Sequence, residues 1–201
     1  DKGIAYAADT AGPTIVSSDT HVHAAIKKHN EFQIAALRER LGRMNPYHFE
    51  GLVKELLDAM KYEDVEVTKQ SGDKGVDVIA YFQFGITRIK EVVQVKRHQA
   101  SIGRPVLDQL RGALPLHGAF RGTIITLGKF AKGAMDVAFY PGAAPITLID
   151  GDTLMKLLVE NEVGMKHRPI KLLEVDESIF VDSDQDVVPE IDSAIGIGLP
   201  N

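Results

Sequence analysis

The feature that most constrains the fold is the order of the apolar segments between residues 45 and 162. One helical pattern is followed by three short strand-like runs, and helical and strand-like segments then alternate. This αβββαβαβα order predicts an α/β fold with a mixed sheet flanked by helices. The first three strands can form an antiparallel meander. The later strands arrive through helical crossovers and should run parallel to their neighbours.

Individual segments carry local signals that support this order. Asn45 is a good helix N-cap and Pro46 fits the first helical position. The apolar positions of "FEGLVKELLDAM" follow the i, i+3, i+4 spacing of a core-facing helix. The β-branched run "GTIITLG" is typical of a strand that is buried on both faces. Strands are expected at "DVEVTK", "VDVIAYF", "EVVQVKR", "GTIITLG" and "PITLID", and further helices at "PVLDQLRGAL", "FAKGAMDVAF" and "GDTLMKLLVENE".

The segments outside this region are less regular. Residues 1–20 have little periodicity and are interpreted as a linker, whereas residues 21–43 are expected to be a helix with a loose apolar stripe. We therefore expect a linker and helix over 1–40, one folded domain over 41–165, and an acidic tail or link to another module over 166–201. The chain begins with Asp1 rather than Met, so a fragment of a longer protein is expected.

Composition excludes several classes of protein. There is no cysteine, so disulfide frameworks and zinc–thiolate sites are excluded, and any metal must be held by oxygen or histidine ligands. No apolar run approaches the length of a membrane span, and no signal peptide is visible, so a soluble, cytoplasmic protein is expected. The net charge is −5, yet residues 171–201 alone carry −7, which leaves a mildly basic body that permits nucleic-acid binding.

A small polar cluster is predicted where two strands pair. Asp77 begins one strand, and Gln94 and Lys96 share one face of the next, because side chains alternate along a strand. If the two strands form a hairpin, Asp77 can lie across from this pair. On a helical wheel, Glu50 falls at the border of the apolar stripe of its helix, where its carboxylate can lean over the sheet.

These residue types together suit metal-assisted phosphodiester hydrolysis. Asp77 would bind a hard cation such as Mg²⁺, with oxygen atoms of Gln94 and of the Val95 backbone as further ligands. Lys96 would neutralise charge on a phosphate or hold the attacking water. Taken singly, each residue has an ordinary explanation. Asp77 could make local hydrogen bonds at a strand start, Glu50 could be solvated on its helix, and Gln94 and Lys96 could lie on the wet face of an edge strand.

The segments "FEGLVKELLDAMKY", "SGDKGVDVIA", "VVQVKR", "GRPVLDQLRGAL", "GTIITLGKFAKGAMDVA" and "ITLIDGDTLMKLL" together resemble the Mrr-type catalytic domain of the PD-(D/E)xK nuclease superfamily, over about residues 41–160. The resemblance implies a restriction-endonuclease-like fold and Mg²⁺-dependent DNA cleavage, with Mn²⁺ expected to substitute. Asp77, Gln94 and Lys96 match the motif residues, and Glu50 matches the helical acid. Gln94 stands where the wider superfamily has an acid, so a second metal site is doubtful.

The resemblance also implies partners. Many relatives cut modified, usually methylated, DNA and recognise it through a separate domain, so such a domain is expected elsewhere in the polypeptide. Cutting both strands of double-stranded DNA takes two active sites, so a dimer or higher homo-oligomer is expected on DNA. Backbone contacts to DNA are expected from residues beside the site, or else these are turn and surface residues: Lys69, Ser71, Lys74, Arg97, His98 and Arg104.

Three alternatives stay open at this point. The first is a repair- or junction-type nuclease with the same fold. The second is a DNA-binding or assembly module without catalytic activity. The third is a flavodoxin-like small-molecule domain, although "SGDKG" is followed by a strand rather than by the helix of a phosphate loop.

Overall fold

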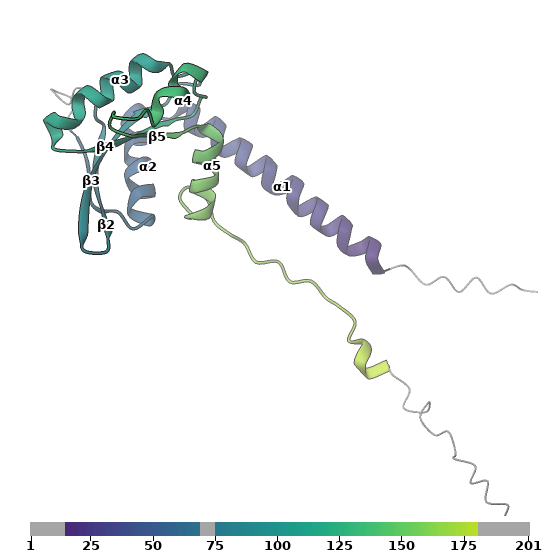
Figure 1. Ribbon diagram of the computed structural model, residues 1–201. Helices are drawn as coiled ribbons and strands as arrows, with labels where there is room; N and C mark the ends of the chain where they lie inside the picture. The colour runs from purple at the N-terminus through teal and green to yellow at the C-terminus, as the bar shows by residue number, and fades with distance from the viewer. Residues whose placement is uncertain (1–14, 69–74, 181–201) are drawn as a thin grey trace, which may run out of the picture. The chain divides into compact units, whose positions relative to one another are not determined.

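A five-stranded mixed sheet forms the centre of the protein. The computed structural model describes residues 15–68 and 75–180 (Figure 1). The strands lie in the order in which they occur in the chain: β1 (Glu63–Val67), β2 (Val78–Phe84), β3 (Thr87–Lys96), β4 (Arg121–Thr126) and β5 (Ile146–Ile149). β1, β2 and β3 are antiparallel, whereas β3, β4 and β5 are parallel. The predicted mixed sheet is confirmed, and a flavodoxin-like domain is excluded because its sheet would be parallel throughout.

Helices cover both faces of this sheet, as Figure 1 shows. On one face, α2 (Pro46–Ala59), α5 (Gly151–Glu160) and the end of α1 (Ile15–Arg43) share a buried core with Val78 and Val93. On the other face, α3 (Arg104–Ala113), the 3-10 helix η1 (Leu114–His117) and α4 (Lys132–Ala138) pack over Val92 and Ile124. The element order from α2 to α5 is the predicted αβββαβαβα.

The local sequence signals explain where the elements begin. The Asn45 side chain accepts a hydrogen bond from the Tyr47 N–H (3.0 Å) and so caps α2, and Asp150 caps α5 by accepting from the Thr153 N–H (2.9 Å). Residues 122–126 of β4 are all buried, as the β-branched run predicts for a strand covered on both sides.

α1 is longer than the sequence pattern predicts. It begins at Ile15, inside the stretch interpreted as a linker. Of its apolar stripe, Leu37 and Leu41 are buried in the core beside α2, whereas Phe32 is 69% exposed. The C-terminal end of α1 is therefore an integral part of the folded domain.

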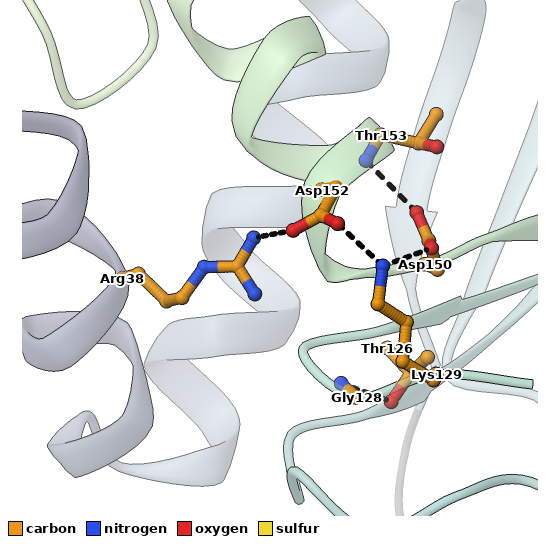
Figure 2. A network of polar contacts seen from close by, with 7 residues as sticks. All are labelled: Arg38, Thr126, Gly128, Lys129, Asp150, Asp152 and Thr153. Carbon is orange, nitrogen blue, oxygen red and sulfur yellow. Dashed lines mark hydrogen bonds and ion pairs between the residues drawn. The ribbon is translucent and has the colours of Figure 1, made fainter. Parts of the chain in front are cut away.

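An ion-pair network fastens α1 to the start of α5 (Figure 2). Arg38 of α1 pairs with Asp152, and Lys129 bridges Asp152 and Asp150, the latter at 2.9 Å. Partial burial opposes ionisation of Asp150, but hydrogen bonds from Thr153 and Lys129 lower its pKa to about 2. Hydrogen bonds to Asp152 and Asp150 raise the pKa of Lys129 above its ordinary value. Hydrogen bonds from Lys129 and Arg38 likewise lower the pKa of Asp152. Asp150, Asp152 and Lys129 are therefore charged at neutral pH, so the network holds α1 by electrostatic attraction.

The chain divides into two units, Asp1–His167 and Arg168–Asn201. The described part of the second unit is extended chain followed by the short 3-10 helix η2 (Glu177–Phe180). Asp176 precedes η2 and accepts a hydrogen bond from the Ser178 N–H (3.1 Å). Among the helices that the structure describes, none is long and apolar enough to cross a membrane.

Candidate active site

A cleft of about 210 Å³ lies at the C-terminal end of β3, beside the first turns of α2. Three of the four predicted catalytic residues, Glu50, Asp77 and Lys96, line it although they come from separate parts of the chain. The full lining is Pro46, Phe49, Glu50, Asp77, Val95, Lys96, Arg97 and His98. The structure therefore gathers in one hollow two carboxylates, an ammonium and a strand backbone.

Asp77 stands where β2 and β3 separate. The ladder between the strands ends at Val78 and Val93, after which the Asp77 N–H donates to the Val93 carbonyl (2.9 Å). The next strand N–H, that of Val95, donates to the Asp77 carboxylate (2.6 Å) instead of to a backbone carbonyl. This side chain thus replaces the backbone of β2 as an acceptor. The carboxylate is fixed against β3, one residue from Lys96.

Glu50 reaches the cleft from α2. The residue before it, Phe49, is fully buried in the core, whereas Glu50 is half-buried. The cap at Asn45 fixes where the helix begins and hence which residues face the sheet. Glu50 therefore lies at the border of the apolar stripe, as the helical wheel predicts.

Gln94 differs from the other motif residues because it does not line the cleft. Its side chain is fully buried, and neither amide atom has a hydrogen-bond partner within the described part of the chain. It lies beneath Gly75, where a Cβ atom, if the glycine had one, would stand 2.6 Å from Gln94 Nε2 and 3.1 Å from Gln109 Nε2. The wet-edge explanation is wrong for this residue, because β3 lies between β2 and β4. A buried amide without hydrogen-bond partners costs about 1–3 kcal/mol of stability. Packing alone therefore does not explain a glutamine at this position.

The oxygen donors around the cleft fit a hard divalent cation. Two carboxylates and the backbone of Val95 in the cleft are ligand types that Mg²⁺ takes together with water. Residues 15–68 and 75–180 contain no group of three or more His, Cys, Asp or Glu that could hold a metal.

The basic residues predicted to contact DNA have different surroundings. Arg97 lines the cleft, but its guanidinium donates to the carbonyl of Gly42 at the end of α1. His98 is exposed at the same cleft. Arg104 is exposed at the start of α3 and pairs with Asp108 (3.1 Å). Lys69, Ser71 and Lys74 lie outside the described residues.

Sequence reasoning missed several features of this region. The contact between Arg97 and Gly42 spans 55 residues and leaves no local signal. Arg111 of α3 is turned inward, where its guanidinium donates to the carbonyls of Val137, Ala138 and Ala144. A signal did exist for Gly75, because the glycines of "SGDKG" permit positive φ, and Gly75 has φ +86°.

Comparisons with known proteins identify the family of this chain. The family model of the restriction endonuclease catalytic domain Mrr_cat matches residues 41–158. A type IV methyl-directed restriction enzyme of Escherichia coli strain K12, EcoKMrr, is 32% identical over 169 residues, which are 82% of this chain and 54% of that enzyme. This chain thus spans about half the length of that relative.

Two solved structures share the fold. The DNA modification-dependent restriction endonuclease AspBHI superposes with a TM-score of 0.54 at 18% identity, over 67% of this chain and 36% of that one. The MspJI restriction endonuclease, solved in complex with a 27-mer oligonucleotide, superposes with a TM-score of 0.51 at 20% identity, over 62% and 31% of the two chains. At these identities the likeness concerns the fold.

The mixed sheet, its flanking helices and the cleft at the end of β3 define a protein of the restriction-endonuclease-like class. Within that class, the chain belongs to the Mrr-type family of restriction endonuclease catalytic domains.

Proposed function

We propose that this chain is the cleavage domain of a modification-dependent restriction enzyme and hydrolyses phosphodiester bonds of double-stranded DNA with Mg²⁺. The observation that carries the proposal is the convergence of Glu50, Asp77 and Lys96 on one cleft. A binding module without catalysis has no need for two acids and an ammonium in the same hollow. The names of the relatives add support, because they describe restriction enzymes, one methyl-directed and one modification-dependent.

In this proposal, Asp77 and the Val95 carbonyl would hold the metal from the cleft. Gln94, the further predicted ligand, does not line the cleft and would have to turn its buried amide oxygen toward them. When bound, the cation stabilises the charge that develops on the phosphate and on the leaving oxygen. The hydrogen bond from the Val95 N–H orients the Asp77 carboxylate before any cation arrives. This preorganisation lowers the cost of assembling the site.

Lys96 and Glu50 act on the substrate side of the cleft. The Lys96 ammonium lies one residue beyond Val95 and donates to a non-bridging phosphate oxygen or to the attacking water. The Glu50 carboxylate approaches from α2 and orients water in the cleft. The attacking water loses a proton to solvent as its oxygen bonds to phosphorus, the bridging P–O bond breaks, and the leaving alkoxide takes up a proton from solvent.

The partners follow from the same proposal. His98, Arg104 and, in the segment before Gly75, Lys69, Ser71 and Lys74 are candidates for contacts to the DNA backbone. Cutting both strands needs two such clefts, so a dimer or higher oligomer forms on DNA. The modified base is read by a recognition domain of the same protein. Mn²⁺ substitutes for Mg²⁺, because both accept oxygen ligands.

The test is cleavage of methylated and unmethylated plasmid DNA with Mg²⁺, with Mn²⁺ and with EDTA. We expect metal-dependent cutting of methylated DNA that Asp77→Ala and Lys96→Ala each abolish. Lys156→Ala is the matched control, because this exposed lysine of α5 lies outside the cleft and should leave cutting unchanged.

Other outcomes point to other functions. Cutting of branched but not of methylated duplexes would favour a junction nuclease. DNA binding without cutting, unaffected by either cleft substitution, would favour an assembly module and would contradict the proposal.

A further inference from the structure

Arg97 connects the catalytic strand to a distant part of the chain. It follows Lys96 directly and lines the same cleft. Its Nη1 donates a hydrogen bond to the carbonyl of Gly42, in the last turn of α1. Its Nε is buried and has no hydrogen-bond partner among the residues that the structure describes. The Arg97 side chain therefore lines the cleft while part of its guanidinium is buried against the end of α1.

The contact gives a hydrogen bond to a backbone carbonyl that has no partner within the helix. The last four carbonyls of an α-helix have no partner within the helix. In α1 the carbonyl of Leu41 accepts from the Met44 N–H (3.2 Å), and that of Gly42 accepts from Arg97. A guanidinium at this end of a helix is also favoured by the helix dipole. Arg97 is thus a C-terminal cap supplied from another element.

This cap joins the two walls of the cleft. From Gly42 the chain runs through the Asn45 cap into α2, which carries Glu50 on one wall. Arg97 itself continues from β3, which carries Lys96 on the other wall. Leu41 is buried in the same core as Phe49, so the α1–α2 junction moves with the start of α2.

We propose that Arg97 is a positioning residue that holds Glu50 at the correct distance from Asp77 and Lys96, rather than a contact to the DNA backbone. The proposal rests on the nuclease function proposed above. Its physical basis is the sensitivity of catalysis to geometry, because a shift of about 1 Å in a reacting group can cost about 100-fold in rate. Removing the cap frees the α1–α2 junction and lets Glu50 move.

The two roles of Arg97 differ in how DNA binding responds to salt. A lost phosphate contact weakens binding and reduces the slope of log K against log salt by about 0.9. Loss of a residue that only positions another side chain leaves the binding affinity and its salt slope unchanged. In the full-length protein we therefore expect Arg97→Ala to lower kcat at saturating DNA by roughly 10- to 100-fold. The DNA Kd and its salt slope should stay at their wild-type values.

Two variants make the comparison sharper. Arg97→Lys keeps the charge but has one ammonium in place of the planar fork, so kcat should recover only in part while the salt slope again stays unchanged. This variant also serves if Arg97→Ala folds poorly. Arg38→Ala removes the other polar tie of α1, which contacts Asp152 rather than the cleft, and should leave kcat unchanged. A salt slope reduced by about one in either Arg97 variant, or an unchanged kcat in Arg97→Ala, overturns the proposal.

A second readout does not depend on cleavage. The amides of Met44 and Phe49 form hydrogen bonds at the α1–α2 junction, and their hydrogen exchange reports its opening. Arg97→Ala should speed their exchange by roughly tenfold relative to the buried amide of Ile124 in β4. Unchanged exchange overturns the positioning role even if the wild-type protein cuts no DNA, so a failure of this proposal is distinct from a failure of the nuclease function.

Discussion

The Asp77 carboxylate accepts a hydrogen bond of 2.6 Å from the backbone N–H of Val95, at the point where β2 and β3 separate. One side chain thus has two tasks. It replaces a missing backbone acceptor in the sheet, and it presents negative charge to the cleft. The two tasks require different properties, because any oxygen acceptor of the right size satisfies the N–H, whereas binding a cation requires the charge.

Asp77→Asn should therefore separate the two tasks. The Asn oxygen still accepts from the Val95 N–H, so we expect the free energy of unfolding to change by less than about 1 kcal/mol. Cleavage should fall below detection, because the charge that holds the cation in the proposed function is gone. Asp77→Leu is the matched comparison. It should also lose activity, but it should cost about 1–3 kcal/mol of stability, because the partly buried Val95 N–H loses its acceptor. Urea unfolding and plasmid cleavage measure both effects, and equal stability of the two variants would contradict this account.

Replacing the buried amide of Gln94 should raise the stability of the protein, whereas Asp77→Leu should lower it. Both of its polar atoms lack partners in the described structure, so replacing them with apolar atoms of similar shape removes a cost. We expect Gln94→Met to raise the free energy of unfolding by about 1–3 kcal/mol and to reduce cleavage strongly. A variant that is both less stable and fully active would show that the amide is satisfied in solution and is not needed by the metal.

Val92 provides the control for this substitution. It lies on the same face of β3 and is fully buried, but it carries no polar group. Val92→Ala should lower stability by the ordinary cost of a cavity and leave the pH and metal dependence of cleavage unchanged.

The fold was predictable because its signals are local. The cap at Asn45, the apolar spacing of α2 and the β-branched run of β4 each specify an element without reference to the rest of the chain. The polar cluster was predictable to the level of Asp77 and Lys96, because strand alternation and hairpin pairing bring them together. The burial of Gln94 was not predictable, because strand alternation shows which face of the sheet a side chain lies on but not which elements cover that face.

The contacts of α1 were also beyond the sequence. Arg38 meets Asp152 and Arg97 meets Gly42, although long stretches of chain separate the partners. An arginine with a tertiary partner cannot be told from a surface arginine when only its neighbours in the chain are known. The same ambiguity applies to Arg111, whose guanidinium ties α3 to the end of α4.

Gly75 should be intolerant of any side chain. Its φ of +86° is strained for other residues, and an added Cβ atom would lie 2.6 Å from Gln94 Nε2. We expect Gly75→Ala to cost about 1–3 kcal/mol and to lower activity by displacing Gln94. Gly85→Ala is the control, because Gly85 also has positive φ (+57°) but nothing lies within 4 Å of its added Cβ. In a double-mutant cycle, Gln94→Ala should relieve part of the cost of Gly75→Ala and none of the cost of Gly85→Ala.

The network at the start of α5 should make stability depend on acid pH. Against the opposing effect of partial burial, hydrogen bonds from Thr153 and Lys129 lower the pKa of Asp150 to about 2, below its ordinary value of 3.8. A carboxyl whose pKa is depressed on folding stabilises the protein fully above the unfolded value. That contribution is lost as the pH falls from about 3.8 through about 2. Asp150→Asn keeps a good N-cap but loses the charge, so it should be less stable than the wild type at neutral pH by up to about 1 kcal/mol.

The difference between the two proteins should shrink as the pH falls and vanish near pH 2, where the wild-type carboxyl is becoming protonated. Salt should reduce the difference at neutral pH, because Lys129 and Asp150 are partly exposed and their attraction is screened. Asp58→Asn is the control, since the Asp58 side chain pairs with Lys54 (2.7 Å) in the last turn of α2 and caps no helix N-terminus. Urea unfolding from pH 2 to pH 7 at low and high salt measures these effects. A stability difference for Asp150→Asn that stays constant across this range would mean that the carboxylate charge contributes nothing to holding α5 and that its cap alone matters.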